Sequence, residues 1–308
     1  MRAFLFPGQG SQSVGMGKAL SQASAAARDV FAEVDEALSQ KLSALMAEGP
    51  EDTLKLTENA QPAIMANAVA VLRAWGIDLA DKADFVAGHS LGEYSAFCAA
   101  GTFDIATAAK LLKRRGQAMQ AAVPVGVGAM AALLGADVEM ARRIAAAAAE
   151  GEVCEVANDN DPSQVVISGH KDAIDRAIAL AKDMGAKRAV ALPVSAPFHC
   201  SLMKPAADAM AEALAGVTLS APSVPLYANV TAQATSDPDA IARQLVEQVT
   251  GMVRWRESIA NMAAAGVGEF VELGGKVLAP MVKRIAPDAT VVSVVTIEDI
   301  ETASKEIA

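Results

Sequence analysis

The sequence predicts an α/β protein in which a mainly parallel sheet is covered by helices on both faces and a smaller β-α-β-β-α-β unit is inserted. The chain has 308 residues, of which 53% are hydrophobic and 20% charged, so it can form a large core and is unlike a disordered chain. Short apolar runs alternate with helical segments in residues 1–123 and 197–308, which is typical of a parallel sheet. Prolines and glycines near 124–128, together with Pro193 and Pro197, bracket residues 124–196 as the insert.

The first part of the chain is expected to hold two buried strands and four helices. The strands are short apolar runs at 3–6 and 84–88. The expected helices cover 24–47, 61–75, 91–100 and 104–119. Pro62 is acceptable in the first turn of its helix, and Gly101 ends the third helix. Thr102 or Asp104 is available to cap the fourth.

The insert and the last part of the chain complete the pattern. The insert is expected to form strands at 127–134, 152–157, 164–168 and 188–192, helices at 138–149 and 173–184, and a turn at 158–162. This order is the split β-α-β pattern of a ferredoxin-like unit. The main rhythm then returns, with strands at 226–230, 269–273 and 290–294 and helices at 202–214, 241–248, 258–265 and 278–285.

Charge and cysteine content exclude several classes of protein. The net charge of −10 argues against a general nucleic-acid binder, because phosphate affinity needs a basic surface. Cys98, Cys154 and Cys200 are scattered, which favours neither a disulfide framework nor a zinc site and suits the reducing cytoplasm. The uncharged run 116–136 contains Pro124, Gly126, Gly128 and Gly135, so we interpret it as a helix end, a linker and a strand. We therefore expect a soluble cytoplasmic protein without a membrane span.

A serine stands between a predicted strand and a predicted helix. The run Gly88-His89-Ser90-Leu91-Gly92 fits the pattern G-x-S-x-G, and this placement is what a nucleophile elbow requires. The tight turn lifts the Ser90 hydroxyl above the strand ends, and the amide of Leu91 faces the place where an oxyanion would form. The alternative is a glycine-rich turn with an incidental serine.

A serine nucleophile needs a base, and the chain has only three histidines. His89 should point away from Ser90, and His170 lies in turn-like sequence of the insert. His199, where the chain leaves the insert, is the best candidate, and a helix-capping histidine is the alternative. Most acidic residues between Ser90 and His199 fall in the insert, so either a distant carboxylate or a neutral oxygen must orient the imidazole. We expect the pH dependence to follow a histidine with a pKa of about 6–7.

One arginine lies on a stripe that is expected to be buried. In the helix 104–119, Arg115 follows Leu111 and Leu112 at helical spacing, whereas Lys113 and Arg114 occupy the other face. A buried charge needs an anionic partner, and a guanidinium binds a carboxylate through two hydrogen bonds. The sequence leaves two alternatives open, a structural ion pair with an internal carboxylate and a pocket cation for a substrate carboxylate.

Six separated motifs extend over essentially the whole chain. They are FPGQGSQ (6–12), TENAQPA (57–63), GHSLGE (88–93), NDN (158–160) with QVVISG (164–169), APFH (196–199), and QLVEQ (244–248) with Trp255. In this order they resemble the motifs of the malonyl-CoA:acyl-carrier-protein transacylases, the malonyl loading enzymes of fatty acid synthesis. The motifs also resemble, slightly less closely, those of the related acyltransferase domains of polyketide synthases. The resemblance implies an α/β-hydrolase-like large domain, 1–123 and 197–308, and a ferredoxin-like small domain, 124–196, with the active site between them.

The resemblance also implies a role for each motif residue. Ser90 would be the acylated nucleophile and His199 its base, held by the backbone carbonyl of Gln248. The amides of Gln9 and Leu91 would form the oxyanion hole. Arg115 would bind the free malonyl carboxylate. The further substrate-binding candidates at the motif positions are Gln9, Gln61, Leu91, Phe198, Asn158 and Asn160.

The implied reaction is ping-pong transfer of malonyl from malonyl-CoA to the pantetheine thiol of acyl carrier protein. No metal or cofactor is implied, since coenzyme A is a substrate fragment, and the resemblance favours a monomer. A hydrolase, a malonate-decarboxylase or polyketide transacylase, and a non-enzymatic scaffold are the alternatives. An acidic carrier protein would need a local basic patch, for which the candidates are Lys187, Arg188, Lys276, Lys283 and Arg284.

Overall fold

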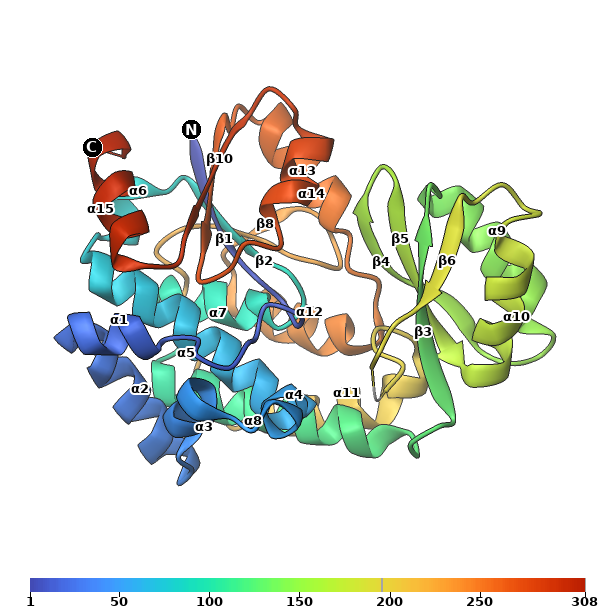
Figure 1. Ribbon diagram of the computed structural model, residues 1–308, viewed down its shortest axis with the longest axis horizontal. Helices are drawn as coiled ribbons and strands as arrows, with labels where there is room; N and C mark the ends of the chain where they lie inside the picture. Colours follow the sequence, from blue (N-terminus) through green and yellow to red (C-terminus); the bar gives the residue numbers. More distant parts are fainter. Residues whose placement is uncertain (195, 308) are drawn as a thin grey trace.

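Two separate sheets organise the computed structural model, which describes residues 1–194 and 196–307 (Figure 1). The larger sheet has the strand order β10-β9-β1-β2-β7-β8, and the smaller has the order β4-β5-β3-β6. All neighbours in the larger sheet are parallel except β7 and β8, whereas all pairs in the smaller sheet are antiparallel. The predicted fold class is therefore confirmed.

The larger sheet is buried on both faces, as its apolar strands predict. Its strands are β1 (Arg2–Phe6), β2 (Phe85–Gly88), β7 (Leu226–Tyr227), β8 (Ala234–Thr235), β9 (Glu269–Leu273) and β10 (Thr290–Val294). Because side chains alternate along a strand, Phe4 and Phe6 enter one core while Ala3 and Leu5 enter another on the opposite face. The sheet therefore lies between two helical layers.

Helices from both ends of the chain form these layers. They are α1 (Lys18–Ala23), α2 (Ala25–Leu38), α3 (Leu42–Glu48), α4 (Glu51–Lys55), α5 (Thr57–Trp75), α6 (Leu79–Lys82), α7 (Gly92–Ala99), α8 (Ile105–Ala122), a 3₁₀ turn η1 (Ser201–Met203), α11 (Lys204–Ala215), α12 (Pro238–Thr250), α13 (Trp255–Ala264), α14 (Ala279–Ile285) and α15 (Ile297–Glu306). Helices α5, α7 and α8 share the core of Phe4 and Phe6, and α13 and α14 share that of Ala3 and Leu5.

The smaller sheet forms the second lobe (Figure 1). Its elements are β3 (Gly128–Leu134), α9 (Val138–Ala149), β4 (Cys154–Asp161), β5 (Gln164–His170), α10 (Lys171–Ala181) and β6 (Arg188–Ala191), in the predicted order. Leu133 and Ile167 pack against α9 and α10, whereas Met130 and Val166 face the core of the large lobe. All these elements lie within 124–196, which we keep as the proposed boundaries of the small domain.

Strand β4 also joins the two lobes, and here the predicted turn at 158–162 is wrong. The strand continues to Asp161 through two irregularities in its pairing with β5. The backbone amide of Asp159 donates to the carbonyl of Val253 at 2.9 Å. The buried Asp159 carboxylate pairs with Arg256, and the Asp161 carboxylate pairs with Arg284, each at 2.8 Å. These partners from the large lobe allow a polar segment to be a buried strand.

Other expectations are also corrected by the structure. The predicted helix 24–47 is divided into α2 and α3, because Ser39 adopts a left-handed conformation with φ 49°. Pro62 lies inside α5, since that helix begins at Thr57. Gly116 of α8 lets the two helices approach closely at this first turn of α5. Strand β7 has two residues instead of five. Helices α1, α4, α6 and α15 and strand β8 were not predicted from the sequence.

Among the described residues, no helix combines the length and apolar character that crossing a bilayer requires. The uncharged run 116–136 is the end of α8, a connection and β3, as predicted.

Candidate active site

The turn after β2 holds Ser90 in a strained conformation. Ser90 has a φ of 54°, in the left-handed region that non-glycine residues seldom adopt. A side chain at Gly88 would meet the backbone of Gly92 at 1.9 Å, and one at Gly92 would meet the carbonyl oxygen of Phe6 at 2.2 Å. The two glycines therefore permit the close crossing of β1, β2 and α7. The turn has the geometry of a nucleophile elbow.

His199 completes a short hydrogen-bonded chain with Ser90. The Nε2 atom of His199 lies 2.7 Å from the Ser90 Oγ atom. The Nδ1 atom faces two backbone carbonyl oxygens, those of Gln248 at 2.9 Å and Gly251 at 3.2 Å. Carbonyl oxygens only accept, so Nδ1 carries the proton and Nε2 is free to accept one from the serine. Two neutral carbonyl oxygens thus orient the imidazole, in place of the carboxylate that the sequence did not offer.

The electrostatic surroundings keep this imidazole neutral. Burial, and next the positive charge of Arg115, lower the pKa of His199 from 6.5 to about 3. The expected pKa of about 6–7 is therefore wrong for this structure, because the sequence could not show how fully the ring is buried. A neutral His199 can accept a proton throughout the physiological pH range.

Arg115 lies beside the serine with neutral hydrogen-bond partners. Its Nη1 atom donates to Gln61 Oε1 at 2.9 Å, and its Nη2 atom donates to Gln248 Oε1 at 2.8 Å and to Ser90 Oγ at 3.2 Å. The guanidinium carbon lies 5.7 Å from the ring centroid of Tyr94. None of the ion pairs in 1–194 and 196–307 includes Arg115, and its Nε atom has no partner there. The structure therefore does not support the structural ion pair.

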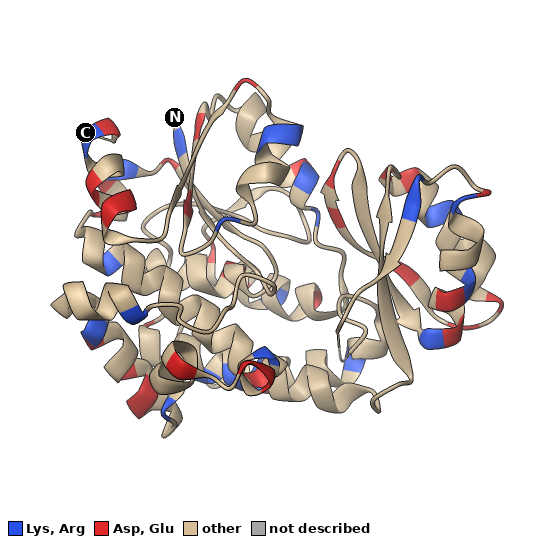
Figure 2. Cartoon of the chain, in the orientation of Figure 1, with Lys and Arg blue, Asp and Glu red and all other residues tan. Residues whose placement is uncertain are grey.

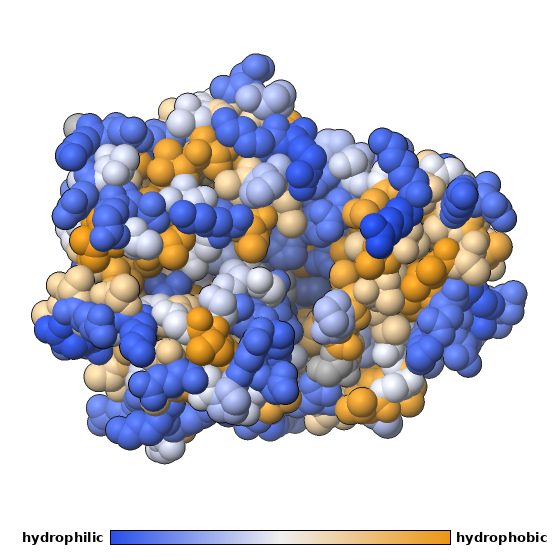
Figure 3. Space-filling model, in the orientation of Figure 1, coloured by the Kyte–Doolittle hydropathy of each residue, from blue (hydrophilic) through white to orange (hydrophobic). Residues whose placement is uncertain are grey.

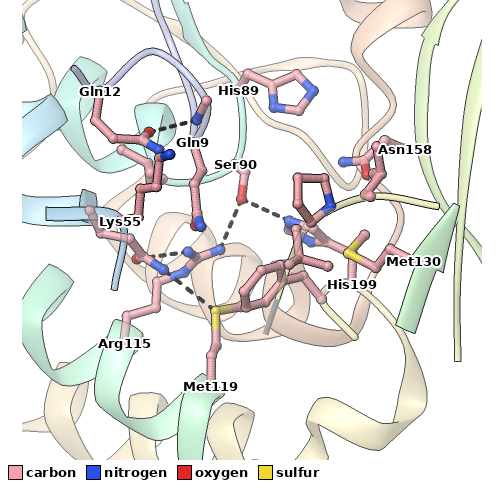
Figure 4. A pocket seen from close by; sticks show the side chains of 17 residues that line it. Gln9, Gln12, Lys55, His89, Ser90, Arg115, Met119, Met130, Asn158 and His199 are labelled. Atoms are coloured by element: carbon pink, nitrogen blue, oxygen red, sulfur yellow. Dashed lines mark hydrogen bonds between the residues drawn. The ribbon is translucent and has the colours of Figure 1, made fainter. Parts of the chain in front are cut away.

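These groups face a cavity of about 370 Å³ between the two lobes. The molecular surface is hollowed between the lobes (Figure 3). On one side Gln12 and Lys55 stand near Gln9, while Met130 and His199 come from the other side and Arg115 rises from α8 toward Ser90 (Figure 4). An apolar wall beside these polar groups fits a short acyl chain with one charged end.

The structure brings most of the predicted site residues to this cavity. Those that line it are Gln9, Gln61, Ser90, Leu91, Arg115, Asn158, Phe198 and His199. Gln248 lies behind the wall, with its side chain bound to Arg115. Asn160 does not line the cavity, since its Oδ1 atom lies 2.8 Å from His89 Nε2. Gln12 and Lys55 line the cavity and were missed.

The other two histidines are engaged elsewhere. His89 points to Asn160 and packs edge-on against Trp255, with ring centroids 5.5 Å apart. His170 Nδ1 accepts from the backbone amide of Val153 at 2.9 Å, in the small lobe. Only His199 meets Ser90.

Sequence reasoning also missed two buried residues that brace the elbow. Asn229 Oδ1 accepts from the Ser90 amide at 2.8 Å, and its Nδ2 atom donates to the carbonyl of Gly88 at 2.7 Å. The backbone amide of Asn229 donates in turn to Glu93 Oε1 at 3.0 Å. Burial raises the pKa of Glu93 to about 7. The only signal for Glu93 was its place in GHSLGE, and Asn229 lay in a predicted strand.

In the part of the chain that the structure describes, no group of three or more His, Cys, Asp or Glu side chains is placed to hold a metal. The three cysteines are free and buried.

Comparison with known proteins agrees with this geometry. The family model of the acyl transferase domain matches residues 3–291. The malonyl CoA-acyl carrier protein transacylase of Escherichia coli (strain K12) is 47% identical over 289 residues, which cover 94% of each chain. The crystal structure of the acyl-carrier-protein-S-malonyltransferase from Bartonella henselae is 53% identical, with a TM-score of 0.97 over 99% of each chain. A type II polyketide-synthase acyl-carrier protein in complex with its malonyl-transacylase gives a TM-score of 0.96 at 40% identity, over 99% of each chain.

Proposed function

The chain belongs to the acyl transferase domain family, and we propose that it transfers malonyl from malonyl-CoA to the pantetheine thiol of an acyl carrier protein through an ester on Ser90. It is an acyltransferase, and the malonyl group it loads supplies fatty acid chain elongation. The residue roles below are the mechanistic part of the proposal.

In the first half-reaction, the Ser90 Oγ atom attacks the thioester carbon while His199 Nε2 takes the hydroxyl proton. The 2.7 Å contact between these atoms supports this step. The backbone amides of Leu91, at the start of α7, and Gln9 stabilise the oxyanion. The carbon–sulfur bond then breaks, and His199 returns the proton to the thiolate of coenzyme A. The product is malonyl-Ser90.

The second half-reaction reverses these steps with a different thiol. The pantetheine thiol gives its proton to His199 and attacks the ester carbon, and Ser90 recovers the proton as it leaves. Arg115 binds the free carboxylate of malonate throughout, because its donors face the cavity next to the serine. The chain's own groups supply every step, so we propose no metal or cofactor.

One observation carries the malonyl assignment. A buried guanidinium stands beside the nucleophile with two amide oxygens and no carboxylate among its hydrogen-bond partners. No carboxylate of the described chain hydrogen-bonds to this charge, so the position can pair directly with an anion of the substrate. A donor with a terminal carboxylate provides one, and an acetyl donor does not.

The test is acylation in the absence of carrier protein. The purified protein is mixed with malonyl-CoA, quenched in acid and weighed intact. We expect one malonyl adduct, which is absent in Ser90→Ala. Free malonate accumulating without an adduct would indicate a hydrolase instead. Neither adduct nor turnover would contradict malonyl transfer altogether.

We propose acyl carrier protein as the partner and the monomer as the working state. Of the basic candidates for docking, Lys283 and Arg284 lie on α14, Lys276 precedes it, and the other two lie around the start of β6. Figure 2 shows where the charged residues lie on the chain. Two of them already have acidic partners, since Arg284 pairs with Asp161 at 2.8 Å and Lys276 lies 3.8 Å from Asp299. Lys283 donates to the backbone carbonyl of Ala289 at 2.9 Å. Lys187 and Arg188 are exposed and remain the stronger candidates. The cytoplasm is the proposed location, which agrees with free cysteines.

A further inference from the structure

Glu93 is a buried carboxyl group that the mechanism above does not use. It lies on α7, one turn from Ser90, and only 1% of its surface is exposed. Its Oε1 atom accepts from the backbone amide of Asn229 at 3.0 Å, and its Oε2 atom accepts from the side-chain Nε2 of Gln248. Both partners are donors. The position therefore demands two acceptors, which an ionised carboxylate supplies.

The polarity of these contacts continues through Gln248 to the cavity. Gln248 Nε2 donates to Glu93 and also to the carbonyl oxygen of Ser90 at 2.9 Å. Its Oε1 atom must then face the other way, where it accepts from Arg115 Nη2 at 2.8 Å. Since an amide has one donating and one accepting end, the acceptor at Glu93 determines which end meets the guanidinium.

We propose that Glu93 is a positioning residue for substrate selection, which orients the Gln248 amide so that Arg115 is held in place to bind the acyl carboxylate. This inference rests on the proposed function and adds a residue to it. Glu93 acts through Gln248 and Arg115 and does not itself touch the substrate. Its loss should therefore affect malonyl transfer more than acetyl transfer.

The substitution Glu93→Gln changes the polarity at almost constant shape. One end of the new amide must face a donor. The Asn229 backbone amide cannot rotate, whereas the Gln248 side chain can. Gln248 then turns its NH₂ group toward Arg115 and withdraws a hydrogen bond from the Ser90 carbonyl. Two donors would meet at the guanidinium, which displaces it.

A direct electrostatic role of Glu93 predicts the opposite change in the malonyl-to-acetyl ratio. If Glu93 acted only through its charge, its removal would reduce repulsion of the malonyl carboxylate and raise the preference for malonyl. If Glu93 only supported the fold, both donors would lose activity together. The ratio of malonyl to acetyl acylation thus distinguishes the three roles.

Protonation of Glu93 should have the same effect as the substitution, because a protonated carboxyl group presents a donor. Burial raises the pKa of this group to about 7, while Asn229, Gln248 and the charge of Arg115 favour ionisation. The titratable groups that interact with it are Arg115 from α8 and Tyr94 from α7, and burial keeps the Tyr94 hydroxyl neutral by raising its pKa. The malonyl preference of the wild-type protein should therefore fall as the pH falls below about 7.

The experiment measures kcat/KM for acylation by malonyl-CoA and by acetyl-CoA, using intact mass, in wild type, Glu93→Gln, Arg115→Ala and the double variant. We expect Glu93→Gln to lower the malonyl-to-acetyl ratio about tenfold, as for a lost charged hydrogen bond. In the Arg115→Ala background the same substitution should leave the ratio unchanged. An unchanged or higher ratio in Glu93→Gln, or an equal fall in both backgrounds, would overturn the proposal.

Two further measurements distinguish a positioning role of Glu93 from a general folding defect. Glu272→Gln is the matched control, because Glu272 is a fully buried carboxylate that accepts from backbone amides at the start of α14, outside the cavity. It should change both donors alike. The wild-type ratio measured from pH 8 to pH 6 needs no variant, and a malonyl-to-acetyl ratio that rises as the pH falls would also overturn the proposal. A wild type that forms no malonyl adduct would instead refute the proposed function.

Discussion

Arg115→Ala gives the sharpest test of how the site recognises its acyl group. Arg115 is 1% exposed, and the hydrogen bonds of its guanidinium go to amide and hydroxyl oxygens. Two unit charges 4 Å apart interact by about 4 kcal/mol at an effective dielectric constant of 20. Truncating one partner of a buried, hydrogen-bonded pair costs about 2–5 kcal/mol. At 1.4 kcal/mol per factor of ten, malonyl acylation should fall by roughly 30-fold to 4000-fold.

The assay compares acylation by malonyl-CoA and acetyl-CoA. Removing Arg115 also frees oxygens of Gln61 and Gln248 and a contact to Ser90, but these losses apply to both donors and cancel in the ratio. Lys113→Ala is the control, because it removes a positive charge from the same helix where Lys113 pairs with Glu58 at 3.3 Å. A malonyl-to-acetyl ratio that stays within about threefold of wild type would refute the pocket role.

Three other outcomes follow from the geometry. Because the pKa of His199 is lowered to about 3, the rate of acylation by acetyl-CoA should stay nearly constant from pH 8 to pH 5. A base with a pKa of 6.5 would instead lower this rate about thirtyfold over the same range, which a pH–rate profile would show. Arg256→Ala leaves the buried Asp159 carboxylate unpaired and should lower the free energy of unfolding in urea by about 2–4 kcal/mol; a loss below 0.5 kcal/mol would contradict it. Gly92→Ala places a methyl group 2.2 Å from the Phe6 carbonyl oxygen, so it should abolish the malonyl adduct or cost about 3 kcal/mol of stability, and a fully active, stable variant would refute the close crossing.

The sequence predicted the fold best where burial and chain breaks agree. Strands β9 and β10 and helix α9 have the predicted bounds, because each is an apolar or amphipathic run between clear terminators. Prediction failed where contacts with a distant segment determine the local structure. The polar end of β4 is a buried strand only because Arg256 and Arg284 of the large lobe meet its carboxylates. Pro62 lies within a helix only because α8 buries the turn before it.

The site divides in the same way. Ser90, His199 and Arg115 could be selected from the sequence because each is a chemically distinctive residue type in a telling position: a serine in an elbow pattern, one of three histidines, and a charge on an apolar stripe. Glu93 and Asn229 could not, because their importance lies in which hydrogen-bond partners the fold presents to them. The lowered pKa of His199 was beyond reach for the same reason, since burial belongs to the folded chain.

The arrangement around Arg115 follows from a conflict between folding and recognition. A buried guanidinium paired directly with a carboxylate would be stabilised in the free protein, and a substrate carboxylate would then have to displace that partner. Amide oxygens from Gln61 and Gln248 satisfy its donors without neutralising its charge. Glu93 stands one amide further away, where it orients Gln248 and leaves the guanidinium without a direct anionic partner. In the proposed mechanism, the positive charge is thereby kept available for the acyl carboxylate.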